Sequence, residues 1–75
     1  MPRYYFDIVD GRNTIDEEGE ELADERAAGS MALKILAELL PGHEDAVLDG
    51  HRLQVRVLDD ERRMRLSLSA GWDEQ

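Results

Sequence analysis

The residues best suited to hold a metal ion are concentrated in one acidic run, Asp16-Glu17-Glu18-Gly19-Glu20-Glu21. Calcium-binding EF-hand loops combine such oxygen ligands with an invariant glycine. With Gly19 in that place, the four side-chain ligand positions fall on Thr14, Asp16, Glu18 and Glu25. Thr14 brings no charge, and an expected strand precedes the run where an EF-hand has a helix. We therefore interpret the run as a solvated acidic turn with no metal; the alternative is an acidic patch for a basic protein.

Two histidines provide the minimum for proton transfer. His43 and His51 flank Glu44, Asp45 and Asp49, and a histidine beside a carboxylate can serve as a general acid or base. The sequence contains no hydrolase motif, phosphate-binding glycine loop or paired-histidine helix to accompany them. We expect no catalytic residue, no cofactor and no enzyme, with a small enzyme or ligand-binding protein at the two histidines as the minor alternative.

Four arginines are expected on the outward face of a C-terminal hairpin: Arg52, Arg56, Arg63 and Arg65. With Tyr5 on the same face, they would resemble a sheet that stacks bases and holds phosphates. The net charge of −9, from 18 acidic and 9 basic residues, opposes nonspecific binding of nucleic acid. Cross-strand pairing with acids of the first hairpin is the favoured interpretation, and no nucleic acid partner is expected.

The length of the chain predicts one small domain. A chain of 75 residues buries only about 60% of the surface that its unfolded form exposes, so it usually needs an additional source of stability, such as a disulfide or an interface with another chain. The sequence has no Cys, which leaves oligomerisation as the ordinary source of added stability. No apolar run approaches the about 18 residues of a membrane span, and no signal peptide is recognised. We expect a cytoplasmic protein without membrane contact.

The N-terminal residues predict a hairpin. Alternating aromatic and β-branched residues over positions 4–9 are typical of a strand. Asp10-Gly11 favours a two-residue turn, followed by a return strand at residues 12–16 with Ile15 pointing inward. Leu22 is expected to anchor the crossing into a helix.

Residues 24–68 predict a helix followed by a second hairpin. Asp24 is expected to cap the helix, and Pro41-Gly42 to end it. Alternating runs at residues 53–57 and 64–68 predict two strands joined by a turn at residues 59–62.

This order of elements, β-β-α-β-β, predicts an α+β fold. We expect a four-stranded antiparallel sheet with one helix packed on one face. Residues 1–70 are expected to form a single small domain and residues 71–75 a flexible tail.

The helix is apolar over a wider arc than one sheet contact needs, since a surface helix usually has an apolar stripe of about 100° or somewhat more. Its expected core face contains Ala28, Met31, Ala32, Ile35 and Leu39. A second flank contains Gly29, Leu33, Leu36 and Leu40, and this flank is the candidate interface. Either the connection through Val47 and Leu48 folds over it, or another protein or second copy covers it.

Much of the chain resembles a family of short bacterial proteins known only as a domain of unknown function. Its members open with a Met-Pro-Arg-Tyr/Phe-Phe-like strand, continue through an Asp-x-x-Gly-x-Glu-Leu-like connection into an Ala-rich helix, and close with a hairpin. The matching stretches are residues 1–6 (MPRYYF), residues 16–22 (DEEGEEL), the helix from Asp24, and residues 53–68. Members often carry a Gly in the final turn, where this chain has residues 59–62 (DDER). The resemblance implies the same fold and no particular activity.

These observations favour a noncatalytic protein-interaction module that self-associates as a homo-oligomer. The alternative is an acidic binder of a basic protein. Raised salt separates the two, because apolar association survives it while exposed charge contacts weaken.

Overall fold

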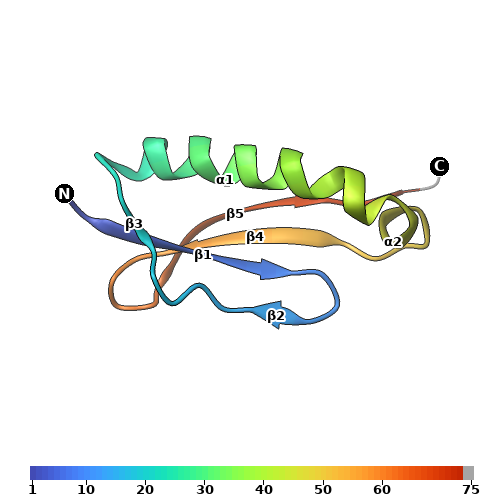
Figure 1. Cartoon of the computed structure of the whole chain (residues 1–75), viewed down its shortest axis with the longest axis horizontal. Helices are drawn as coiled ribbons and strands as arrows, with labels where there is room; N and C mark the ends of the chain where they lie inside the picture. The colour runs from blue at the N-terminus through green and yellow to red at the C-terminus, as the bar shows by residue number, and fades with distance from the viewer. Residues whose placement is uncertain (74–75) are drawn as a thin grey trace.

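The computed structural model describes residues 1–73, in which a long helix lies along one face of an antiparallel sheet (Figure 1). The predicted α+β fold is confirmed, although the sheet has five strands in place of the expected four. Part of the predicted tail at residues 71–75 lies outside the described residues. The elements, in chain order, are β1 (Arg3–Val9), β2 (Asn13–Thr14), β3 (Glu20–Glu21), α1 (Glu25–Leu39), the 3₁₀ helix η1 (Leu40–His43), α2 (Glu44–Leu48), β4 (Leu53–Leu58) and β5 (Met64–Ala70).

β1 and β4 form the centre of the sheet. The order is β2-β1-β4-β5 with every neighbouring pair antiparallel, and β3 pairs with the opposite end of β1 from β2. Phe6 lies opposite Val57, and Ile8 lies opposite Val55, so these side chains share one face of the sheet. One edge is thus divided between β2 and β3, while β5 forms the other edge along its whole length.

The return strand of the first hairpin is interrupted, which corrects the strand expected at residues 12–16. Ile15, expected to point inward, is 53% exposed. The physical cause is a side chain: Asp16 Oδ2 accepts a hydrogen bond from the Phe6 backbone N–H at 3.0 Å. The carboxylate thereby takes a strand donor that a continuous return strand could have paired.

The first turn also differs from the expected two-residue turn. Val9 pairs with Asn13, which leaves three residues in the loop. Within it the Asp10 N–H donates to the Arg12 carbonyl at 3.1 Å, and Gly11 has φ +100°. Glycine adopts this left-handed conformation freely because it has no Cβ.

α1 begins as the sequence predicts. Asp24 Oδ1 accepts a hydrogen bond from the Ala27 N–H at 2.9 Å, and this cap satisfies a donor that the helix leaves unpaired. The helix ends at Leu39, and Pro41 lies in the 3₁₀ turn that follows. Leu22 packs against the core, as expected. In the described part of the chain, no helix has the length and apolarity to cross a membrane.

The face that α1 buries is rotated from the expected one. Leu36, assigned from the sequence to the candidate interface, is only 7% exposed and lies in the core with Ala28 and Ala32. The two alanines allow the helix to lie close to β4, whose Val55 and Val57 are fully buried. An apolar arc this wide does not determine by itself which of its sides faces the sheet. The partly buried helix residues packed around this core are Met31, Ile35, Leu39 and Leu40.

Candidate functional site

The acidic run is a loop organised by its first carboxylate. Asp16 Oδ1 accepts the backbone N–H groups of Glu18 and Gly19, both at 3.1 Å, while Oδ2 holds Phe6. Burial raises the pKa of Asp16, but the three N–H donors and the nearby Arg62 outweigh it, so this pKa lies below its ordinary value. The charge of Asp16 is therefore balanced by the protein's own backbone, which is a structural role.

The calcium arrangement considered from the sequence is not assembled. Glu25 accepts a hydrogen bond from Arg65 Nε at 2.8 Å, whereas the Asp16 carboxylate accepts from backbone N–H groups. Across residues 1–73, no three His, Asp or Glu side chains are grouped so that they could hold a metal ion.

Gly19 allows this loop to lie against β1. Its φ is +68°, and a Cβ there would stand 2.8 Å from both the Tyr4 carbonyl oxygen and the Tyr5 ring. Any other residue would force the loop away from the strand. The acidic run thus needs its glycine for close approach to β1.

Arg62 connects the second hairpin to the same loop. Its guanidinium forms an ion pair with Asp7, donates to the Asp16 carbonyl at 3.4 Å, and lies 5.5 Å from the centroid of the Tyr5 ring. Asp7 is only 6% exposed, and its other carboxylate oxygen accepts the Asp16 N–H at 3.0 Å. Each partner is supplied from within the chain, so this cluster holds the two hairpins together.

Sequence reasoning missed Arg62. Its φ of +62° lies in the left-handed region, which residues other than glycine rarely adopt. The available signal was the final turn, residues 59–62 (DDER), which has no Gly to adopt a left-handed conformation.

The four arginines expected on one outward face are dispersed. Arg65 pairs with Glu25 at the start of α1, so its expected position away from the helix is wrong. The pairing of β4 with β5 is irregular at Val57 and Leu58, and such an irregularity changes the face of the sheet to which a nearby side chain such as that of Arg65 points. The other three contact exposed or neighbouring groups: Arg56 contacts Gln54, Arg63 contacts Glu61, and Arg52 contacts Asp73.

His43 ties the end of the helical region to the first hairpin. Its Nδ1 lies 2.8 Å from the Leu39 carbonyl oxygen and its Nε2 lies 2.9 Å from Asp10 Oδ2. Both partners are acceptors, so the geometry suits the doubly protonated imidazolium. The Leu39 carbonyl and then the Asp10 carboxylate raise the pKa of His43, while the hydrogen bond from His43 lowers the pKa of Asp10. His51, the other histidine of interest, lines a small hollow together with this pair.

The candidate interface on α1 is partly exposed to solvent, and the structure places Ala37 in it instead of Leu36. Because Leu36 is buried, Ala37 continues the exposed stripe, and we define the open flank as Gly29, Leu33, Ala37 and Leu40. Leu33 is 59% exposed in the middle of this flank. A Cβ added to Gly29 would make only an ordinary contact, 3.8 Å from Leu66 Cδ2. Packing within the monomer therefore does not require the glycine.

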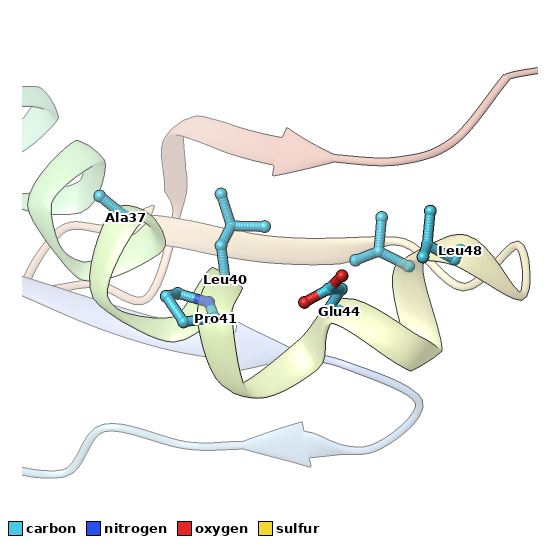
Figure 2. Close-up of a pocket in the computed structure, with 6 residues that line it drawn as sticks. Ala37, Leu40, Pro41, Glu44 and Leu48 are labelled. Atoms are coloured by element: carbon cyan, nitrogen blue, oxygen red, sulfur yellow. The ribbon is translucent and has the colours of Figure 1, made fainter.

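Two hollows lie along the open flank. One, of about 430 Å³, is bounded by Ala37 and Leu40 on one side and by Val47 and Leu48 on the other. Figure 2 shows Leu40 and Leu48 projecting towards the same side, with Glu44 between them. The connection through Val47 and Leu48 thus borders the C-terminal end of the open flank, and it leaves Leu33 exposed to solvent.

The second hollow, of about 710 Å³, lies between α1 and the edge strand β5. Gly29 and Leu33 line it from the helix, while Leu66, Ser67 and Leu68 line it from β5. The open flank and the free sheet edge therefore form one continuous surface, and this surface is the candidate functional site.

These features define the class: a small α+β protein with one helix on an antiparallel sheet and, beside a free edge strand, a groove lined by both apolar and polar residues. A family model, described as a domain of unknown function (DUF6894), matches residues 3–71. The chain belongs to this family, and the resemblance recognised from the sequence is confirmed. Comparison with curated proteins and with solved structures found no match.

Proposed function

We propose that the protein is a noncatalytic protein-interaction module that associates with a second copy through the open flank. The observation that carries the proposal is the groove in which Gly29 and Leu33 lie beside β5. The proposal includes a cytoplasmic location, with which the absence of Cys is consistent.

The burial of Leu33 and the presence of Gly29 both favour association at the open flank. Full burial of a leucine side chain contributes about 2 kcal/mol, and Leu33 has most of that surface still in contact with solvent. A glycine inside a helix costs about 1 kcal/mol relative to alanine. Gly29 would recover that cost if it let another backbone approach closely.

The test is the molar mass in solution, measured by light scattering over a range of concentrations. We expect the wild-type chain to have at least the mass of a dimer at high concentration, and Leu33→Asp to have the mass of a monomer. Ile15→Asp is the matched control, because Ile15 is 53% exposed at the opposite edge of the sheet. A monomeric wild-type chain at high concentration would contradict the proposal.

The second candidate function is an acidic binder of a basic protein. It is supported by the exposed carboxylates of Glu17, Glu18, Glu20 and Glu21, which lie together around β3. The two functions respond differently to salt, because at about 1 M ionic strength the Debye length is only about 3 Å. Association that persists in 1 M salt supports the apolar flank, whereas association that is lost supports the acidic surface.

A further inference from the structure

The edge strand β5 provides the other half of the groove. We propose that two copies join edge to edge through β5, in antiparallel pairing about a two-fold axis at Ser67, so that their sheets become one. This inference rests on the proposed self-association and specifies its geometry. β5 is suited to the role because it is seven residues long, contains no Pro, and has no charged side chain from Leu66 to Ala70.

The opposite edge is protected against such pairing. It consists of two strands of two residues each, β2 and β3, with the acidic loop between them. The Phe6 N–H there is already bonded to Asp16. Two copies of this edge would also bring Glu20 and Glu21 against their equivalents, and like charges facing each other are destabilising.

A second copy of the chain is the occupant that the sequence of β5 fits. A two-fold axis at Ser67 sets Leu66 opposite the partner's Leu68, within the regular part of β5 that follows the irregularity in its pairing with β4. Leu66 and Leu68 lie on the sheet face covered by α1, because they are aligned with Val57 and Val55 of β4. The apolar layer beneath the α1 helices of the two copies would therefore continue across the interface (the seam) between the two β5 strands.

The charges are also complementary in this orientation. Arg63 lies just before β5 and Asp73 just beyond its end, and within one chain Arg63 pairs with Glu61 and Asp73 with Arg52. Antiparallel pairing about Ser67 brings Arg63 diagonally across from the partner's Asp73, so an attraction between the two copies would add to these exposed pairs. Parallel pairing would instead bring the arginines of the two copies together.

The same axis brings the two α1 helices into packing distance. α1 packs against both β4 and β5, so its axis lies about one strand spacing from the seam. The two helices would then lie about 9–10 Å apart, within the 8–10 Å typical of packed helices. Gly29 and Leu33 line the groove together with Ser67, so the partner's helix would approach this part of α1. This contact explains a helical glycine that the monomer does not need.

Single cysteines test the geometry cleanly, because the chain has no Cys of its own. Directly paired residues have Cα atoms about 4.5–5.5 Å apart, which a disulfide can span. Ser67→Cys should therefore form a disulfide-linked dimer on mild oxidation. Ser69→Cys is the matched control, since its two copies would lie about 13 Å or more apart. We expect about tenfold more cross-linked dimer from Ser67→Cys than from Ser69→Cys.

A nitroxide spin label on the same cysteines reports proximity without the geometry of a disulfide, and we expect stronger dipolar broadening at position 67 than at 69. Light scattering of each variant then separates the outcomes. A dimer that cross-links more at position 69, or that shows proximity at neither position, overturns the edge pairing while leaving self-association intact. A monomer in every measurement overturns both.

Discussion

The guanidinium of Arg62 forms an ion pair with the Asp7 carboxylate, although the two residues lie 55 positions apart in the chain. Asp7 is buried on β1, whereas Arg62 is in the turn between β4 and β5 with a left-handed backbone. The pair fixes that turn over the acidic loop, so the two hairpins are connected by side chains as well as by the sheet.

Replacing Arg62 by glycine should reveal two opposed effects. Arg62→Gly relieves about 1 kcal/mol of left-handed backbone strain but leaves the Asp7 carboxylate without its cation. Breaking a buried pair costs about 3–5 kcal/mol, and the 41% exposure of the Arg62 side chain reduces that loss. We expect a net loss of about 1–2 kcal/mol in the free energy of unfolding by urea. Arg63→Gly, which removes an exposed pair, should change it by less than about 0.5 kcal/mol.

A double-mutant cycle isolates the pair itself. Asp7→Asn removes the negative charge, so Arg62→Gly should cost less in that background than in the wild type. Equal costs in the two backgrounds would mean that Arg62 acts through the Tyr5 ring or the turn rather than through Asp7.

Asp16 should be the acidic residue on which stability depends most. Asp16→Ala leaves the Phe6 N–H and the loop N–H groups without their acceptor, and we expect a loss of about 2 kcal/mol in the free energy of unfolding. Glu17→Ala is the control, because it removes one exposed carboxylate from the same loop and should be nearly neutral. A similar loss from both variants would point to a general effect of charge.

The pH dependence of Asp16 has a definite sign. Its pKa is lowered by folding, so its stabilisation is present above the unfolded value, near 3.8, and is lost as the pH falls through the folded value. Acid unfolding of Asp16→Ala should therefore be less steep than that of the wild type.

The pair of His43 and Asp10 predicts the opposite dependence at higher pH. Folding raises the pKa of His43, so its stabilisation is complete below 6.5 and is lost as the pH rises through the folded value. His43→Gln should therefore lower the free energy of unfolding more at about pH 5.5 than at about pH 8.5. The matched control is His51→Gln at the exposed histidine. An equal effect of His43→Gln at both pH values would show that the imidazolium is not the stabilising form.

Gly29 provides a variant that should separate folding from association. Gly29→Ala improves helix propensity, and its Cβ fits beside Leu66, so we expect the isolated monomer to gain about 0.5–1 kcal/mol. The same methyl group should weaken self-association, as measured by light scattering, because it holds the partner's helix away. Gly42→Ala is the control for association, because its Cβ would enter open space outside both hollows. A Gly29→Ala dimer as tight as the wild type would exclude close helix contact at this position.

The sequence by itself determined three of the strands and the start of the long helix. Alternation predicted β1, β4 and β5, and the carboxylate of Asp24 predicted the start of α1, because both signals depend on residues within a few positions of each other. Only the tertiary structure decided which side of α1 is buried, why the return strand is broken, and where Arg62 binds. Leu36 is buried together with Ala28 and Ala32, which places the core on the Leu36 side of the alanines, and the Asp16–Phe6 and Arg62–Asp7 contacts join residues 10 and 55 positions apart. Periodicity along the chain carries no information about such distant partners, which meet only when the sheet and the helix are assembled.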